Sequence, residues 1–249
     1  MTVEIIKGTK RLSAAHRIIC QRGLPYKRLL LLPIPTTKDG VVVNGTDVTL
    51  DSLTLGVGVG DAVAGYGLPS RFVDKLTARG ARVYDAMYDE QFQQKNAELT
   101  VIGALGDIIT AKDRAPSDVT YGIIGYGRIG SALLKYLLML GASATVFTRR
   151  ESVRIALGEW GIKSSSSTRL EDYMALDVLI NTAPTTITDA RGVGALYDAG
   201  VSVFDLASGE NFDHSDKVVR LPGVPDRVYP KSAGEAYANA LCDALGAKA

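Results

Sequence analysis

A glycine-rich turn constrains the fold more than any other feature of the chain. It follows an apolar run at residues 121–124 and opens a run whose apolar residues recur at helical spacing up to residue 140. The first glycine of such a turn permits a tight bend, the second lets a pyrophosphate approach the backbone, and the third lets the helix pack on the strand. Free N–H groups at the helix start then face the phosphates. The pattern predicts a dinucleotide-binding strand–helix–strand unit, with a site that includes Gly125, Gly127, Arg128, Ile129 and Gly130. A turn that merely packs a helix on a sheet is the alternative.

The residues after the next predicted strand favour NADP over NAD. An acidic side chain there usually binds the ribose 2′-hydroxyl of NAD and would repel a 2′-phosphate. This chain has Thr148, Arg149 and Arg150 at that place. Two guanidinium groups and a hydroxyl suit a phosphate, because guanidinium forms charge-assisted and bidentate hydrogen bonds with it. We therefore expect NADP, and NAD as the weaker candidate; alternatively the arginines are solvated loop cations that Glu151 partly neutralises.

Composition excludes several classes of protein. The chain has 249 residues, of which 46% are hydrophobic and 22% charged, as in an ordinary globular protein of one large or two small domains. A net charge of +1 gives no general attraction for nucleic acid or an anionic membrane. Neither a signal peptide nor a membrane-spanning run is evident, so we expect a cytoplasmic protein. Two cysteines and two histidines, Cys20, Cys242, His16 and His214, are too few for a metal cluster, and we expect no metal.

The order of apolar and helical segments predicts two domains. Strand and helix patterns alternate along the chain, which favours a Rossmann-type, doubly wound parallel sheet with a second, smaller and abbreviated α/β domain. A polar stretch at residues 113–118 marks the expected boundary. We therefore predict an N-terminal substrate domain at residues 1–112 and an NADP-binding domain at residues 113–231. A C-terminal helix at residues 232–249, opened by a capping box of Ser232 and Glu235, is expected to pack back on the first domain.

Two further segments end predicted strands of the cofactor domain. Ligands of open α/β sheets bind beyond the carboxyl ends of the strands. We therefore expect these segments to line the ribose and nicotinamide side of the site, and they comprise Asn181, Thr182, Ala183, Pro184, Asp205, Leu206 and Ala207.

Several segments together closely resemble one family, the bacterial dipicolinate synthase A proteins. Besides the glycine turn they are Leu31-Leu32-Pro33-Ile34-Pro35, Asn181-Thr182-Ala183-Pro184, Asp205-Leu206-Ala207-Ser208, and Leu221-Pro222-Gly223-Val224-Pro225 running into Pro230-Lys231-Ser232-Ala233-Gly234. The resemblance implies two α/β domains with the nicotinamide between them. It also implies NADP-dependent oxidation of dihydrodipicolinate, a small dicarboxylate, to pyridine-2,6-dicarboxylate, the calcium-chelating solute of spores. A second, flavoprotein-like subunit would accompany this one, and the layout makes a homo-oligomer the expectation.

Two departures from that family set limits on the resemblance. Only residues 1–28 precede the strand at Leu29, without the family's glycine-rich opening, so we expect an abbreviated first domain. Ile102 stands where the family pattern leads us to expect a glutamate. Glu98 lies one helical turn away and is the carboxylate available to replace it.

The catalytic candidates are Lys231, Ser232 and Glu98. Lys231 is expected just before the C-terminal helix, where a cation and free helix N–H groups would converge on a substrate carboxylate. An equally good interpretation is that Lys231 is a solvated lysine without a ligand. For Ser232, a role as helix cap is favoured over substrate binding. Thr36 and Thr37 offer hydroxyls after another strand, where ordinary turn residues are equally expected.

Two other functions remain open from the sequence. A 2-hydroxy acid dehydrogenase shares the two-domain layout, but Ser208 and Gly209 occupy the region where its arginine would stand, and no histidine follows His214. We expect His214 to be a surface residue and His16 to be structural. A non-catalytic NADP-binding subunit is the alternative from another class, motivated by the short N-terminus and by Ile102.

Overall fold

The computed structural model describes residues 1–209, 211–212 and 215–246, and the chain forms two compact units. Unit 1 comprises Met1–Leu99 and Pro225–Ala249, and unit 2 comprises Thr100–Val224. The chain passes from unit 1 to unit 2 within a single long helix, α4 (Glu90–Ile109), and returns at the start of α9 (Val224–Val228). The polar stretch at residues 113–118 lies inside unit 2, where its last residues form a 3₁₀ turn, η2 (Pro116–Asp118), before a strand.

Unit 1 is built on a four-stranded parallel sheet in the order β1-β2-β3-β4. Its strands are β1 (Thr2–Ile5), β2 (Arg28–Leu31), β3 (Asp61–Gly65) and β4 (Arg82–Asp85). Helix α1 (Lys10–Arg22) links the first two strands, α2 (Leu50–Leu55) precedes β3, α3 (Ser70–Ala78) links the last two, and η1 (Ala86–Tyr88) leads to α4. Residues 2–22 thus form a strand and a helix before β2 without a glycine-rich opening. Val3 and Ile5 supply the apolar side of β1, and Leu12, Ala15 and Ile19 that of α1.

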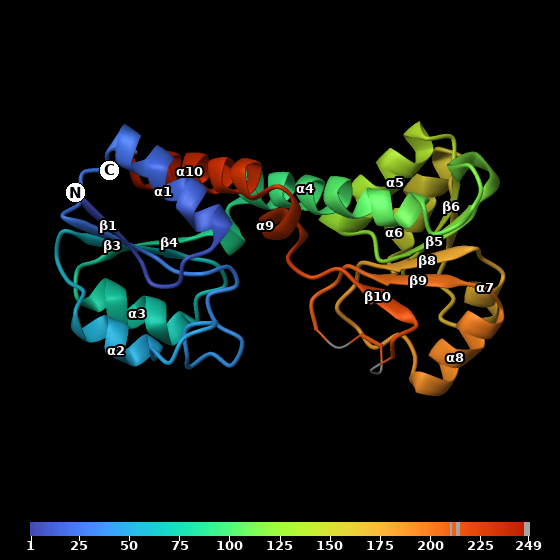
Figure 1. Cartoon of the computed structure of the whole chain (residues 1–249), viewed down its shortest axis with the longest axis horizontal. Coiled ribbons are helices and arrows are strands. Elements are labelled where there is room, and N and C mark those ends of the chain that lie inside the picture. The colour runs from blue at the N-terminus through green and yellow to red at the C-terminus, as the bar shows by residue number, and fades with distance from the viewer. Residues whose placement is uncertain (210, 213–214, 247–249) are drawn as a thin grey trace. The chain divides into compact units, whose positions relative to one another are not determined.

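The strands of unit 1 are buried on both faces by alternate residues. Leu29 and Leu31 pack with α1 and the C-terminal helix α10 (Pro230–Gly246), whereas Leu30 packs with α2 and α3. Figure 1 shows these helix pairs on opposite sides of the sheet. Such two-sided burial explains the continuous apolar run of β2, because successive side chains of a strand point to opposite faces.

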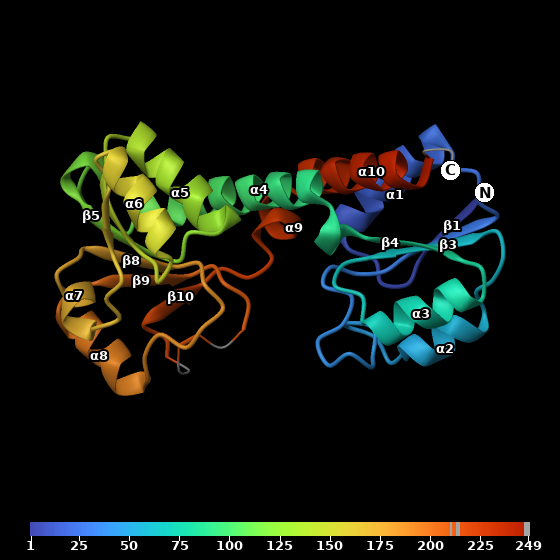
Figure 2. The same ribbon diagram turned by 180° about the vertical axis from the view of Figure 1, so that it is seen from behind.

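Helix α10 packs along α1, although the two lie at opposite ends of the chain (Figures 1 and 2). The approach is close at Gly234, where an added Cβ would lie 2.5 Å from the carbonyl oxygen of Arg11. The helix begins at Pro230, so Lys231 and Ser232 are already in its first turn. The predicted capping box of Ser232 and Glu235 is therefore wrong: proline is well suited to a first helical position because it has no N–H to satisfy there.

Unit 2 is a doubly wound sheet of six parallel strands in the order β10-β9-β8-β5-β6-β7. The strands are β5 (Thr120–Ile124), β6 (Ser143–Phe147), β7 (Lys163–Ser165), β8 (Val178–Asn181), β9 (Ser202–Asp205) and β10 (Val218–Arg220). If the strands are renumbered along the chain with β5 as the first, the order from β7 to β10 across the sheet is 3-2-1-4-5-6. This is the strand order of dinucleotide-binding folds. The predicted fold class is confirmed.

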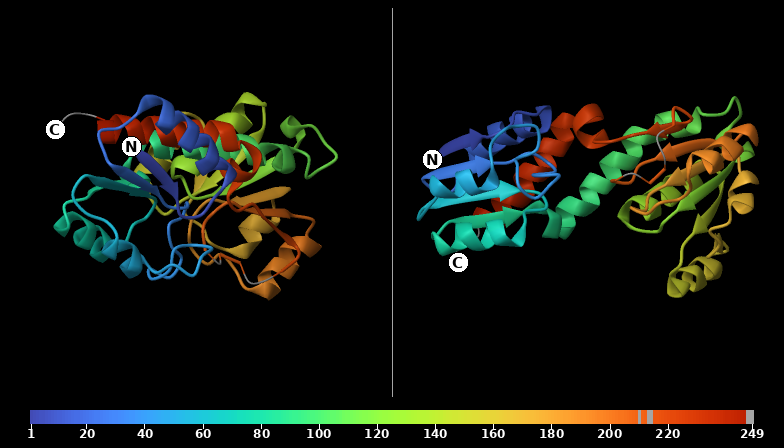
Figure 3. Two further views of the ribbon diagram at one scale, coloured as in Figure 1. Left: turned by 60° about the vertical axis from the view of Figure 1, so that its left-hand side comes forward. Right: turned by 90° about the horizontal axis from the view of Figure 1, so that it is seen from below.

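Helices cover both faces of the unit 2 sheet. The end of α4 packs with α5 (Arg128–Met139) and α6 (Glu151–Glu159) on one face, through residues that include Ile108, Leu133 and Leu157. Helices α7 (Leu170–Met174) and α8 (Ala190–Asp198) pack on the other, through Tyr173 and Leu196. Figure 3 shows these helices flanking the sheet from two further directions. Among the helices that the structure describes, none combines the length and the apolar character needed to cross a membrane.

Candidate cofactor-binding site

The glycine turn of unit 2 is a closely packed bend between β5 and α5. Gly125 has a φ of +91°, which only glycine adopts at no steric cost, and its N–H donates to the carbonyl of Phe147 over 2.9 Å. A Cβ on Gly130 would lie 2.4 Å from the carbonyl oxygen of Gly125. A Cβ on Gly127 would meet no atom within 4 Å. Two glycines therefore serve the packing of the turn itself, and the third leaves open space above the backbone.

The start of α5 offers hydrogen-bond donors to an anion. Gly127 is the N-cap residue and provides no side-chain cap, and the first turn contains no acidic residue. The first N–H groups of a helix have no partner within the helix, and the helix dipole favours negative charge there. The open space at Gly127 lies at this helix start. These features fit the pyrophosphate of a dinucleotide.

A cleft of about 390 Å³ adjoins the turn and lies wholly within unit 2. It joins the glycine turn to the ends of β6 and β8 and to the segment after β7. The residues that line it include Gly125, Tyr126, Gly127, Thr148, Arg149, Arg150, Ser166, Ser167, Thr168, Thr182, Ala183 and Pro184. The structure thus brings most of the predicted cofactor residues to one surface.

Cations and hydroxyls collect at one end of this cleft. Arg150 donates a hydrogen bond to the carbonyl of Tyr126, which ties the arginine loop to the glycine turn. Arg149 is exposed, and within the described residues its guanidinium forms no hydrogen bond or ion pair. Ser166 and Ser167, which the sequence analysis did not assign to the site, line the same cleft. Their signal in the sequence was the serine run at residues 164–167.

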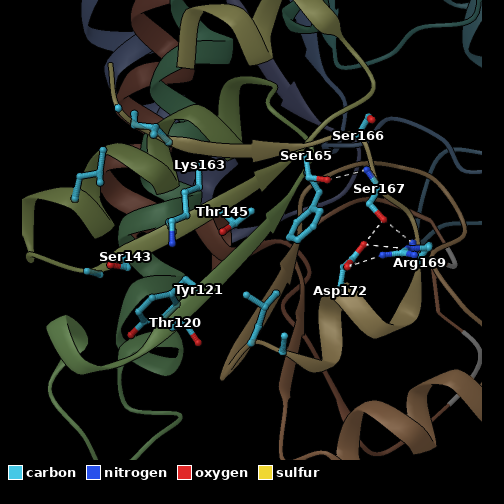
Figure 4. Close-up of a pocket in the computed structure, with 18 residues that line it drawn as sticks. Thr120, Tyr121, Ser143, Thr145, Lys163, Ser165, Ser166, Ser167, Arg169 and Asp172 are labelled. Atoms are coloured by element: carbon cyan, nitrogen blue, oxygen red, sulfur yellow. Dashed lines mark hydrogen bonds and ion pairs between the residues drawn. The ribbon is translucent and has the colours of Figure 1, made fainter. Parts of the chain in front are cut away.

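The segment that carries these serines is fixed by Asp172. The carboxylate of Asp172 accepts a hydrogen bond from the hydroxyl of Ser167 and pairs with Arg169 over 3.2 Å, and Ser167 N–H donates to the hydroxyl of Ser165 over 3.0 Å. Figure 4 shows this set of contacts at the start of α7. The hydrogen bond from Ser167, and then Arg169, lower the pKa of Asp172. The carboxylate is therefore charged at neutral pH, and it holds the segment in place.

A wider hollow of about 850 Å³ lies over β5, β6 and β7 (Figure 4). Thr120, Ser143, Thr145 and Lys163 line it, but the glycine turn does not. The short helix α7 leaves this part of the sheet uncovered. The helix start that lines this hollow is that of α7, whose first turn carries Glu171 and Asp172 and would repel an anion, so the hollow does not fit a pyrophosphate.

Asn181 and Asp205 form a buried network instead of lining the cleft. The side-chain amide of Asn181 donates to Asp205 Oδ1 over 2.9 Å, and its Oδ1 accepts from the N–H of Ala183 over 3.0 Å. Asp205 also accepts from Ala207 N–H and from Asn211. Both side chains are buried, as is Leu206. The network positions Thr182 to Pro184, which do reach the cleft. Arg128, Ile129 and Gly130 contribute the start of α5 without lining this cleft in the described structure.

The three catalytic candidates are not joined by any contact in the described residues. Lys231 and Ser232 are exposed in the first turn of α10. Glu98 pairs with Lys95 over 3.3 Å on α4. All three belong to unit 1, and Ile102 lies further along α4, in unit 2. Their common role in catalysis stays a prediction.

Thr36 and Thr37 are engaged within their own loop. The hydroxyl of Thr36 donates to the carbonyl of Pro33 over 3.2 Å and accepts from Tyr66 N–H over 2.8 Å, and Thr36 is buried. Thr37 donates to Asp39 over 3.0 Å. His16 is half-buried on α1, and His214 lies outside the described residues.

No protein-family model matches the chain. The chain is 24% identical to dipicolinate synthase A of Bacillus subtilis over 237 residues, which cover 89% of this chain and 80% of that protein. The resemblance to dipicolinate synthase A is confirmed. The crystal structure of dipicolinate synthase A from Bacillus halodurans superimposes with a TM-score of 0.79 at 20% identity, over 98% of both chains. The D-lactate dehydrogenase of Salmonella follows with a TM-score of 0.60 at 13% identity, over 98% of this chain and 96% of that one. These likenesses to solved structures support the two-unit α/β fold.

Proposed function

We propose that this protein is an NADP-dependent oxidoreductase of the dipicolinate synthase A type, which oxidises dihydrodipicolinate to pyridine-2,6-dicarboxylate. The cleft of unit 2 carries the proposal: a glycine turn with an uncapped helix start stands beside a cluster of arginines and hydroxyls. The likeness to dipicolinate synthase A over most of both chains supports the substrate.

The arginine end of the cleft favours NADP over NAD. Among the described residues that line the cleft none is acidic, whereas an acidic side chain there would repel a 2′-phosphate. Arg149 supplies a guanidinium without a partner in the described part of the chain, and Ser166 supplies a hydroxyl donor in the same cleft, whereas the hydroxyl of Ser167 already donates to Asp172. Arg150 is held against Tyr126 and therefore acts as a fixed charge. Cationic and hydroxyl donors of this kind are suited to the dianionic 2′-phosphate.

The reaction needs positioning more than it needs reactive side chains. Bound NADP supplies the hydride acceptor. The protein must hold the dicarboxylate beside it and supply cations or N–H donors for two carboxylates, because orientation provides most of the rate enhancement. We assign Lys231 to one carboxylate, with Ser232 and Glu98 as neighbouring polar groups. The sporulation pathway, a cytoplasmic location, a homo-oligomer and a second, flavoprotein-like subunit belong to the same proposal.

A turnover assay tests the proposal. The purified chain is mixed with NADP and with dihydrodipicolinate made enzymatically in the same cuvette, and pyridine-2,6-dicarboxylate and NADPH are quantified. We expect both products in equal amounts. Lys231→Ala should lower turnover by about tenfold or more while NADPH affinity changes less than twofold, since the loss of one carboxylate contact costs on the order of 1.5–3 kcal/mol. NADPH binding without any turnover would contradict the catalytic part of the proposal.

A non-catalytic NADP-binding subunit is the second candidate. Ile102, 37% exposed on α4, favours it, because an apolar side chain stands where the family pattern leads us to expect a carboxylate. Under this alternative the chain holds NADPH, shows no turnover, and changes the assembly or activity of a partner protein. Ile102→Glu separates the two: recovery of turnover would mark a lost catalytic carboxylate, and unchanged turnover in an active enzyme would show that Ile102 is tolerated.

A further inference from the structure

Unit 1 contains a buried arginine that is incompletely hydrogen-bonded. Arg11 lies in the first turn of α1 and is 4% exposed. Neither its Nε nor its Nη1 has a hydrogen-bond partner within the described residues. A buried charge is normally paired, because removing it from water without compensation costs several kcal/mol. Desolvation accordingly lowers the pKa of Arg11, against the opposing effects of Asp226, Tyr237 and Tyr66.

The nearby carboxylates accept hydrogen bonds from groups other than the guanidinium of Arg11. Asp226 Oδ1 accepts the backbone N–H of Arg11 over 2.9 Å and so caps the start of α1. Asp85 accepts the N–H groups of Gly67, Leu68 and Met87 over 2.7–2.9 Å. Asp89 accepts from the hydroxyl of Tyr84 and from Phe92 N–H. Asp226 therefore offers the guanidinium a nearby opposite charge, but within the described residues no carboxylate accepts a hydrogen bond from its Nε or Nη1.

A second buried donor lies beside the arginine. Tyr237 of α10 is fully buried, and its hydroxyl has no partner in the described structure. Its ring packs edge to face against Phe92 at 5.6 Å and against Tyr84 at 6.0 Å between centroids. Helix α10 meets α1 at Arg11, because a Cβ on Gly234, three residues before Tyr237, would lie 2.5 Å from the carbonyl oxygen of Arg11. Tyr66 stands nearby, and it is half-buried and holds a 3.4 Å bond to Gln93.

The position of this pair in the fold is that of a ligand site. Arg11 follows β1, Tyr66 follows β3 directly, and Asp85 ends β4, so these residues gather at the carboxyl ends of parallel strands. Ligands of open α/β sheets bind at that edge. Figure 1 shows α1 and α10 side by side over the sheet. Guanidinium and phenol donors with free hydrogen-bonding capacity at this edge match a carboxylate, which accepts several hydrogen bonds at once.

We propose that Arg11, with the hydroxyl of Tyr237, is a carboxylate-binding site for the substrate in unit 1. The inference rests on the proposed function for the identity of the ligand, a small dicarboxylate. Arg11 would take one carboxylate in a bidentate manner, and the phenol would donate to the same group. Nε and Nη1 are sealed from solvent in this structure, so binding requires a rotation of Arg11 or Tyr66.

Replacement of Arg11 by an apolar residue tests the assignment. Arg11→Met keeps an unbranched side chain and removes the buried charge, and Arg17→Met, on an exposed part of α1, is the matched control. Affinity for pyridine-2,6-dicarboxylate, affinity for NADPH and the Tm of the ligand-free protein are measured for each. We expect Arg11→Met to weaken dicarboxylate binding on the order of 100-fold, since the substitution leaves a buried carboxylate of the ligand without its charged partner. NADPH affinity should change less than twofold, and the ligand-free Tm should stay equal or rise, because residues kept for binding often reduce stability.

Two results would overturn the site. One is dicarboxylate affinity of Arg11→Met within threefold of the unchanged chain. The other is a combination of two observations: the Tm of Arg11→Met falls by many degrees, and Arg11→Lys binds the dicarboxylate as tightly as the unchanged chain. Lys keeps the charge but lacks the planar guanidinium that bidentate binding needs, so unchanged binding in Arg11→Lys would mean that the arginine does not hold a carboxylate in this way. If Arg11→Met does not fold, Arg11→Lys alone tests the site, and we expect its affinity for the dicarboxylate to be about tenfold lower than that of the unchanged chain.

Failure of the proposed function is distinguishable from failure of the site. If pyridine-2,6-dicarboxylate does not bind the unchanged chain, the protein is titrated with oxalate, succinate and lactate by thermal shift. Stabilisation of the unchanged chain but not of Arg11→Met by one of these acids would uphold the site and reject the substrate. If none of these acids stabilises the unchanged chain or Arg11→Met, the site is overturned.

Discussion

A Cβ atom on Gly130 would lie 2.4 Å from the carbonyl oxygen of Gly125. This approach of α5 to the glycine turn leaves no room for any side chain, and Thr182 reinforces it by donating its hydroxyl to the carbonyl of Ile124 over 2.9 Å. Because the turn is closed in this way, the first N–H groups of α5 are aimed at the space above Gly127. Gly130 is needed for the close packing of α5 on the turn, whereas Gly127 leaves space for a ligand. Substitutions at the two positions should therefore have different effects on stability and on cofactor binding.

Gly130→Ala should destabilise unit 2, whereas Gly127→Ala should not. The alanine methyl at position 130 meets backbone, which must shift, so we expect a loss of about 1–3 kcal/mol of unfolding free energy. At position 127 the backbone is extended and the space is open, so the loss should stay below about 1 kcal/mol, although the methyl would obstruct a pyrophosphate. Chemical denaturation and NADPH titration of both variants provide the check. Equal destabilisation by the two alanines would contradict the assignment.

Arg149→Gln should reduce the preference for NADPH. The guanidinium of Arg149 lines the cleft without a partner in the described residues, so its loss should not disturb folding. We expect NADPH affinity to fall about tenfold and NADH affinity to change less than twofold, since a single charge-assisted hydrogen bond contributes roughly 1.5 kcal/mol. Arg191→Gln, on the exposed start of α8, is the control for a general charge effect. A parallel loss for both cofactors would refute the role in 2′-phosphate binding.

Asn181→Ala should be costly for stability. The substitution removes the donor to Asp205 and the acceptor for Ala183 N–H, and it leaves the buried carboxylate with fewer partners. We expect a loss of about 2–4 kcal/mol. Asn239→Ala, which removes a surface hydrogen bond with Arg22, should cost less than about 0.5 kcal/mol. Thermal unfolding of the two variants compares them, and similar Tm values would show that the network contributes little.

Asp177→Asn should act in a pH-dependent way. The carboxylate of Asp177 accepts the N–H and the hydroxyl of Thr120 at 2.8 and 2.7 Å and pairs with Arg114, and these contacts lower its pKa in that order. Because the pKa in the folded state lies below that of the unfolded state, the stabilisation is fully present above about pH 4 and is lost as the pH falls through the folded pKa. At pH 7 we expect Asp177→Asn to cost about 1–2 kcal/mol. Urea unfolding between about pH 2.5 and 7 should show the variant and the unchanged chain converging in acid, and a constant difference would disprove the linkage.

The sequence was sufficient for the fold of unit 2 and for many of the residues that line its cleft. Its strands have continuous apolar runs, and Gly125, Gly127 and Gly130 have the spacing of a known turn, so local pattern and tertiary role agree. Thr148 and Arg149 were found because their place follows from the strand that precedes them. Ser166 and Ser167 were missed, because a run of hydroxyls has no periodicity and only the folded segment brings it to the cleft.

Three features of unit 1 show what the sequence pattern does and does not contain. In the N-terminal segment, which has no glycine-rich opening, the apolar residues Val3 and Ile5 alternate in β1, and Leu12, Ala15 and Ile19 recur at helical spacing in α1. Arg11 gave no signal, because a single arginine in an amphipathic helix is usually solvated. Its burial arises from α10, which reaches α1 from the other end of the chain. The capping box at Ser232 failed because Pro230 starts the helix earlier.

Direct titration of the purified chain with NADPH and with NADH, followed by nucleotide fluorescence, tests the central claim that the unit 2 cleft is an NADP site. We predict that NADPH binds at least tenfold more tightly than NADH and that Gly127→Val abolishes the binding of both. NADH affinity equal to or above that of NADPH would contradict the role given to the arginine end of the cleft, and unchanged binding in Gly127→Val would contradict the site itself.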